Sequence, residues 1–307
     1  MRVGDTSGAG VWITASTTDT TQTVGMAIKM VTAAASINNT YLLTFGQSNL
    51  YPDRYNARVA YDSTSNRFAI SDRTGTVYTG VNTAFTGAWY YIELQVVFHQ
   101  TAGSWEFHVD GVSAASASTR DTLWGTEPVP AMIMCGDGGT QWIDDVYIDN
   151  IYYLDSTGTE NTTFLGVSEV GLLLPSGNGT TSDMTGSDAD KTDNYLLVDE
   201  NPADTADYVE SATEGDLDTY AMDDLTGTPA VRAVMTTIYA QKDDTGAKFL
   251  RPIIRSGTGD YAGTSHTLSN GVYVQLDDVW DVDPYTGLTW AYTAVNAMEV
   301  GQEVRDS

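Results

Sequence analysis

The sequence predicts an all-β protein made of two sandwich domains. Residues 89–98 and 105–109 alternate apolar and polar side chains with a period of two, which is typical of strands with one face in a core and one in water. Thr, Val, Tyr, Gly and Ser dominate the composition and periodic runs of helix formers are scarce, so short strands joined by turns are expected. A chain of 307 residues is long enough for two domains.

The elements of the first domain follow one another at the spacing of a sandwich. Residues 1–23 are rich in Gly, Ser and Thr, and they are expected to form an N-terminal arm or an edge strand. The first domain itself is expected over 24–160. Besides the hairpin, its strands are predicted at 25–31, 41–47, 57–61, 67–72, 76–80, 131–135 and 141–155. In the last of these, Val146, Ile148, Tyr152 and Leu154 are expected on one face.

The hairpin over 89–111 also fixes an outer face. Ile92 and Leu94 alternate with polar residues on its first strand, and Phe107 and Val109 do so on its second. The outer face then carries His99, Glu106 and His108. Two imidazoles and a carboxylate can bind a transition metal, but no fourth ligand is evident, and ordinary solvated side chains are the alternative.

Three segments resemble the concanavalin A-like and laminin-G-like jelly rolls. They are Trp89-Tyr-Tyr-Ile-Glu-Leu94, Gly103-Ser-Trp-Glu-Phe-His-Val-Asp-Gly111 and Ile143-Asp-Asp-Val-Tyr-Ile148, and the resemblance covers about residues 10–158. It implies a jelly-roll sandwich. It assigns no activity, because the family includes lectins, adhesion modules, glycosidases and spacers.

The second half is expected to hold a connector over 161–194 and a smaller, acidic β-sandwich domain over 195–307. Between Asp183 and Asp224 there are 14 acidic residues and one basic residue, Lys191, so exposed loops are expected there. Strands are predicted at 231–241, 249–255 and 271–279. The segment 291–298 is a candidate short helix, although Thr293 and Val295 lower its propensity.

This half resembles a domain of structural proteins from tailed bacteriophages. The resemblance is carried by Asp207-Tyr-Val209, Arg251-Pro-Ile-Ile-Arg-Ser-Gly257, Val282-Asp-Pro-Tyr-Thr-Gly287 and Val295-Asn-Ala-Met-Glu-Val-Gly301. It implies a virion component, and it leaves capsid decoration and a tail or fibre component open. No repeat of fixed period is present, which argues against a β-helical fibre shaft.

Charge narrows the classes of partner. The chain has 14 Lys and Arg against 41 Asp and Glu, a net charge of −27, which repels phosphate backbones and anionic lipid surfaces. Nucleic-acid binding is therefore not expected. Nor is membrane insertion, because no 18-residue apolar run exists.

The motifs of common enzyme classes are missing, so the chain is expected not to be an enzyme. The single Cys135 lies in an apolar run. The 144–149 region carries Asp but none of the Glu residues that glycosidases of the resembled fold place on one strand. No nucleophile elbow, phosphate loop or nucleotide fingerprint is found, and the tract 183–193 fails as an EF-hand because its Gly and final Glu are absent.

Two sets of residues are candidate sites. Tyr51, Tyr55 and Trp124 lie in loop-like sequence and could stack against sugar rings, with core or interface packing as the alternative. Asp137, Asp144 and Asp145 are candidate calcium ligands, because jelly rolls of the resembled family often bind calcium through loop carboxylates near that end. Surface turns are the alternative for these acids, and no other cofactor is expected.

Taken together, the sequence favours a non-enzymatic structural protein on the surface of a tailed phage virion. Its expected partners are capsid or tail proteins, with copies of the chain forming a homo-oligomer in a symmetric assembly. A carbohydrate-binding adhesin that recognises host surface glycans is the alternative. A degraded or unusual glycan-cleaving enzyme is the third hypothesis.

Overall fold

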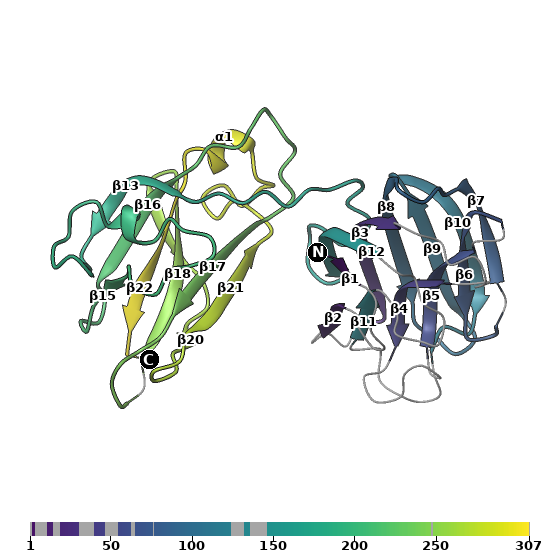
Figure 1. Cartoon of the computed structure of the whole chain (residues 1–307), viewed down its shortest axis with the longest axis horizontal. Helices are drawn as coiled ribbons and strands as arrows, with labels where there is room; N and C mark the ends of the chain where they lie inside the picture. The colour runs from purple at the N-terminus through teal and green to yellow at the C-terminus, as the bar shows by residue number, and fades with distance from the viewer. Residues whose placement is uncertain are drawn as a thin grey trace. The chain divides into compact units, whose positions relative to one another are not determined.

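A computed structural model describes residues 2–3, 11–14, 19–30, 40–46, 55–62, 65–75, 77–123, 132–135, 146–246 and 248–306. The chain divides into two compact units, Met1–Val170 and Gly171–Ser307 (Figure 1). Within the described ranges the helices are a single turn of α-helix, α1 (Tyr292–Val295), and a 3₁₀ turn, η1 (Asn194–Leu197). The remaining elements are strands, which confirms the all-β prediction.

The first unit is a sandwich of two six-stranded antiparallel sheets, sheet A and sheet B. Sheet A has the order β1 (Arg2–Val3), β12 (Val146–Asp155), β3 (Thr21–Met30), β8 (Trp89–Val97), β9 (Gly103–Val109) and β10 (Val112–Arg120). Sheet B has the order β2 (Val11–Thr14), β11 (Met132–Cys135), β4 (Thr40–Gly46), β5 (Tyr55–Asp62), β6 (Arg67–Asp72) and β7 (Val77–Thr83). In each sheet one strand from the C-terminal part of the unit, β12 or β11, lies between two strands from its N-terminal part, as in the concanavalin A-like jelly roll that was predicted.

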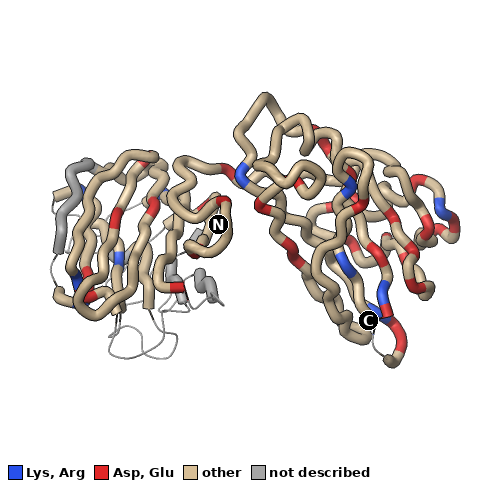
Figure 2. The backbone as a smooth tube through the Cα atoms, turned by 180° about the vertical axis from the view of Figure 1, so that it is seen from behind, with Lys and Arg blue, Asp and Glu red and all other residues tan. Residues whose placement is uncertain are grey.

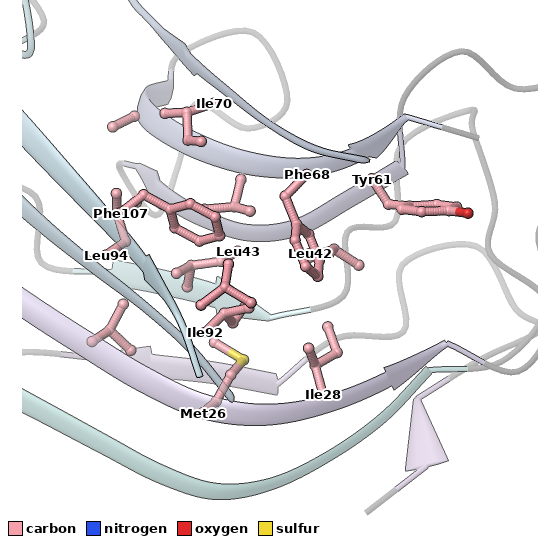
Figure 3. Close-up of a cluster of buried hydrophobic side chains, with 14 of the residues drawn as sticks. Met26, Ile28, Leu42, Leu43, Tyr61, Phe68, Ile70, Ile92, Leu94 and Phe107 are labelled. Carbon is pink, nitrogen blue, oxygen red and sulfur yellow. The ribbon is translucent and has the colours of Figure 1, made fainter. Parts of the chain in front are cut away.

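The core of the first unit lies between these sheets. Met26 and Ile28 of β3 lie opposite Leu43 and Phe68 of sheet B, and all four are at most 1% exposed (Figure 3). Phe107 of β9 packs edge to face on Phe68, with ring centroids 5.8 Å apart. The inner residues of the predicted hairpin therefore close the sandwich as the alternation indicated.

A buried ion pair between Asp72 and Arg120 links β6 of sheet B to the end of β10 of sheet A. Asp72 is fully buried and accepts hydrogen bonds from Arg120 Nε at 2.7 Å and Trp105 Nε1 at 3.3 Å. Thr74 adds its backbone N–H and its hydroxyl. Burial alone would raise the pKa of Asp72, but the hydrogen bonds from Arg120, Thr74 and Trp105 together lower it.

The predicted single face of the last strand is wrong beyond Asp149. The pairing of β12 with β3 slips between Asp149 and Tyr152, where Asn150 has a φ of 51°. This bulge reverses the alternation, so Val146 and Ile148 are in the core while Tyr152 lies on the outer face of sheet A.

The second unit contains one six-stranded sheet, sheet C, and a two-stranded ribbon. Sheet C has the order β13 (Pro175–Ser182), β16 (Leu217–Met222), β22 (Glu299–Arg305), β18 (Phe249–Ser256) and β19 (Gly259–Ala262), and β20 (His266–Thr267) also pairs with β18. The ribbon joins β17 (Val234–Ala240) to β21 (Val274–Trp280), and β14 (Thr185–Gly186) pairs with β15 (Val209–Glu210). Apolar clusters around Leu250 and Leu276, and around Ile254 and Trp290, pack the ribbon and α1 against sheet C.

The acidic tract of the second unit is more ordered than predicted. It contains η1, β15 and β16, and it buries Asp218, which is 0% exposed. Asp218 accepts hydrogen bonds from the Met184 backbone N–H, Asn194 Nδ2 and the Tyr220 hydroxyl. Along the second unit as a whole, acidic residues far outnumber basic ones (Figure 2). A buried carboxylate with three donors therefore organises a segment that composition alone assigned to loops.

Candidate functional site

Most of the predicted site residues lie outside the described residues. This holds for Tyr51 and Trp124 of the proposed sugar site and for Asp137, Asp144 and Asp145 of the proposed calcium site. Within the described ranges, no group of three or more His, Cys, Asp and Glu side chains is arranged to hold a metal ion.

Tyr55 is the predicted site residue that the structure describes. It begins β5, is half-buried, and carries the Arg58 guanidinium over its ring at 3.7 Å from the centroid. Arg58 Nε donates to Ser71 Oγ at 2.9 Å. One ring face of Tyr55 is thus covered by Arg58, so this tyrosine offers at most one face to a ligand.

A row of residues crosses the outer face of sheet A in register. Tyr152 of β12 pairs with Gly25 of β3, Gly25 pairs with Glu93 of β8, and Glu93 pairs with His108 of β9. Gly25 has no side chain, so the Tyr152 ring lies across β3 and its hydroxyl donates to Glu93 Oε1 at 2.5 Å. A Cβ at position 25 would overlap the Tyr152 ring, which explains why glycine occupies a strand interior here.

Residues 161–170, here called the strap, cover this row. Phe164 stacks on the His108 ring, with centroids 3.8 Å apart and planes at 16°. The backbone N–H of Gly166 donates to Glu93 Oε1 at 2.8 Å, and that of Leu165 donates to the Tyr152 hydroxyl at 3.2 Å. The strap is thus held on the sandwich by polar groups beneath it, although it falls within the predicted connector 161–194.

The strap covers the Glu93 side chain and shields it from water. Glu93 is 0% exposed, and His108 Nδ1 lies 3.9 Å from its second oxygen, Oε2. Burial raises the pKa of Tyr91 to about 12, with a further upward contribution from Glu93. Burial and the hydrogen bond to Glu93 also raise the pKa of Tyr152. Both phenols are therefore neutral donors at physiological pH, and the row under the strap has a structural role.

The predicted group of His99, Glu106 and His108 is only partly assembled. His108 Nε2 and Glu106 Oε1 are 2.9 Å apart on the outer face. His99 lies beyond the end of β8, where its Nδ1 accepts hydrogen bonds from the backbone N–H groups of Thr101 and Ala102. The His99 ring is therefore used by the turn.

A second row on the outer face of sheet A is open to solvent. Tyr147 of β12 pairs with Lys29 of β3, and Lys29 pairs with Trp89 of β8. The adjacent residues Ile28 and Val146 are in the core, so alternation places all three side chains on the outer face. Trp89 is 48% exposed, and Lys29 and Tyr147 are half-buried. We call these three residues the Trp89 row.

The Trp89 row could not be found by listing loop aromatics. Alternation alone puts Lys29 outside in the run Met26-Ala-Ile-Lys-Met30, and Trp89 lies at the start of a predicted strand. What unites them with Tyr147 is the pairing of β3 with both β8 and β12, which brings together residues far apart in the chain.

In the described part of the chain, no helix is long and apolar enough to cross a membrane.

Comparisons with known proteins add a fold-level likeness. No family model matches the chain, and no curated protein sequence matches it. An endo-β-1,4-glucuronan lyase from Trichoderma reesei is 14% identical over 50% of this chain and 79% of its own, with a TM-score of 0.37. The galectin LEC-6 from Caenorhabditis elegans is 9% identical over 48% of this chain and 94% of its own, with a TM-score of 0.30.

A Trypanosoma rangeli sialidase is 16% identical over 43% of this chain, but the match covers only 20% of the sialidase, with a TM-score of 0.35. The matched structures thus include enzymes that act on carbohydrates as well as a galectin. The expectation that the chain is not an enzyme is contradicted by these matches and is withdrawn. At such identities and TM-scores, the matches assign neither an activity nor a ligand to this chain.

Proposed function

We propose that the first unit binds carbohydrate through the Trp89 row. The observation that supports this function is the placement of Trp89 and Tyr147 on one exposed face, two strand intervals apart, or roughly 10 Å. The C–H groups of a sugar ring rest favourably on the π face of an aromatic side chain, and the indole N–H and the phenol can hydrogen-bond its hydroxyls. Two such rings on a rigid sheet form a flat platform for a glycan chain.

The platform is pre-organised by the sheet that carries it. The Trp89 row lies on three adjacent, paired strands whose opposite faces are packed in the core, so little backbone ordering is needed on binding. The exposed Trp89 and the half-buried Tyr147 also contrast with Tyr91 and Tyr152, which lie under the strap and are unavailable to a ligand.

A glycan array with the full chain tests this function. Trp89→Ala is expected to weaken binding by about 2 kcal/mol, or roughly 30-fold, which is typical of a central aromatic in a binding site. Tyr147→Ala should weaken it as well. Tyr208→Ala, which removes an aromatic that is 40% exposed in the second unit, is the control and should leave binding unchanged.

Two results would contradict the assignment. Binding that persists in Trp89→Ala and Tyr147→Ala but disappears in Tyr51→Ala or Trp124→Ala would move the site to the loops. The absence of binding to any glycan by the folded wild-type chain would reject carbohydrate recognition altogether.

We also propose that the second unit attaches the chain to a tailed-phage particle. The support is the resemblance of its sequence to a domain of phage structural proteins and its own separate apolar clusters, which let it pack independently of the sandwich. Capsid or tail proteins would be its partners, with copies of the chain arranged by the symmetry of the particle. Density-gradient fractions of lysed producing cells are expected to contain the chain with intact particles, and its recovery only in the free-protein fractions would reject this proposal.

A further inference from the structure

We infer that the glycan bound by the Trp89 row is anionic and that Lys29 pairs with its acidic groups. This inference rests on the proposed carbohydrate binding by the same row. Lys29 is the middle residue of the row, paired on one side with Tyr147 and on the other with Trp89. A sugar stacked on either ring would therefore bring its ring substituents close to the Lys29 ammonium.

Lys29 has no acidic partner among the described residues. Carboxylates pair with six other described cations, namely Arg73, Arg120, Lys248, Arg251, Arg255 and Arg305. Acidic residues outnumber basic ones by 41 to 14, so pairing is the easier arrangement in this chain. Lys29 thus offers a positive charge between the two aromatic members of the Trp89 row, Trp89 and Tyr147.

The position of Lys29 strengthens its attraction for an anion. The side chain is half-buried between two aromatic residues, and its neighbours Ile28 and Met30 are fully buried. An ammonium partly removed from water interacts more strongly with an opposite charge, because the effective dielectric constant is lower there.

The surrounding charge selects the kind of anion. Asp149 lies one row away on the same face, opposite Ala27, and accepts a hydrogen bond from the backbone N–H of Asn150 at 2.9 Å. The net charge of −27 also repels dense polyanions such as nucleic acids. A glycan that carries separated carboxylate or sulfate groups matches one cation flanked by two stacking rings.

The test compares matched probes on the full chain. Partly methyl-esterified oligogalacturonate, in which the free carboxylates are separated, and the fully methyl-esterified oligomer share one backbone and differ in charge, and a sparsely sulfated oligosaccharide of similar length separates sulfate from carboxylate recognition. Titration calorimetry of the wild type is expected to show about tenfold or greater preference for an acidic probe over the ester. Lys29→Met keeps the apolar stem and should remove this preference while the ester still binds. Lys29→Arg should restore it, and Asp149→Asn should tighten binding of the acidic probe.

The outcomes separate this inference from the proposed function. Equal binding of acid and ester that depends on Trp89 would overturn the inference and leave carbohydrate binding intact. A preference for the acid that survives in Lys29→Met would overturn it too, because another cation would then be responsible. If neither these probes nor neutral glycans show binding that Trp89→Ala weakens, both proposals fail. Circular dichroism and urea unfolding confirm that each variant is folded.

Discussion

Replacing Gly25 by alanine tests whether the contact between Tyr152 and Glu93 requires the absence of a side chain at position 25. The added Cβ would overlap the Tyr152 ring, so the ring must leave its place across β3. The variant then loses the hydrogen bond from Tyr152 to Glu93 and the one from Leu165 to Tyr152. A hydrogen bond to a charged group contributes about 1.5–3 kcal/mol and a neutral one about 1 kcal/mol.

The net effect follows from opposing contributions. Losing the two hydrogen bonds costs about 2.5–4 kcal/mol, and replacing glycine by alanine within a strand returns about 0.5–1 kcal/mol. We expect Gly25→Ala to lower the free energy of unfolding of the first unit by about 1.5–3.5 kcal/mol. Urea unfolding followed by tryptophan fluorescence measures it, since five of the seven Trp residues belong to this unit.

A double-mutant cycle isolates the cause. In the Tyr152→Ala background the overlap is gone, so Gly25→Ala should be neutral or stabilise by up to about 1 kcal/mol. The control is Gly177→Ala in β13, where the new Cβ would meet Ala221 Cβ at 3.7 Å, an ordinary contact. If Gly25→Ala is as stable as the wild type, or is equally harmful with and without Tyr152, the reasoning is wrong.

Two further predictions concern buried carboxylates. The pKa of Asp72 is lowered in the folded state, so the ionised carboxylate stabilises the fold above the ordinary Asp pKa. This stabilisation is lost as the pH falls through the pKa of Asp72 in the folded state. Urea midpoints measured from about pH 5 down to pH 2 should therefore fall less steeply in Asp72→Asn than in the wild type. Equal slopes would show that Asp72 is not responsible. Asp218→Ala leaves the buried donors of Met184, Asn194 and Tyr220 without their acceptor, and at about 1–3 kcal/mol for each unsatisfied donor it should destabilise the second unit by at least about 3 kcal/mol, as measured by hydrogen exchange of sheet C. Unchanged exchange in sheet C would refute this.

The alternation of apolar and polar residues predicted the sandwich because it depends only on residues that are neighbours along one strand. Each of Ile92, Leu94, Phe107 and Val109 is buried as the period of two required. Glu93 obeys the same alternation and points outward, yet it is 0% exposed, since the strap lies over it. Burial of an outward residue depends on a segment about 70 positions away, and local patterning carries no information about that contact.

Local sequence patterns predicted the candidate site even less well than they predicted the burial of Glu93. Tyr51, Tyr55 and Trp124 were selected because loop sequence suggests exposure, whereas the Trp89 row lies within strands, where Trp89 is exposed and Lys29 and Tyr147 are half-buried. Finding that row needs the register of β3 against two partners, which a single sequence does not determine. The reversal at Asn150 is similar, because one residue with positive φ changes which face Tyr152 occupies.

The strap sets where the first unit can be cut from the rest of the chain. A truncation at the predicted domain end, residue 160, would remove Gly166 and Leu165 and leave Glu93 and Tyr152 without two of their donors. It would also uncover the His108 ring, on which Phe164 is stacked. An isolated sandwich intended for crystallisation or ligand screening should therefore extend to Val170, whose backbone N–H closes the strap on Asn150.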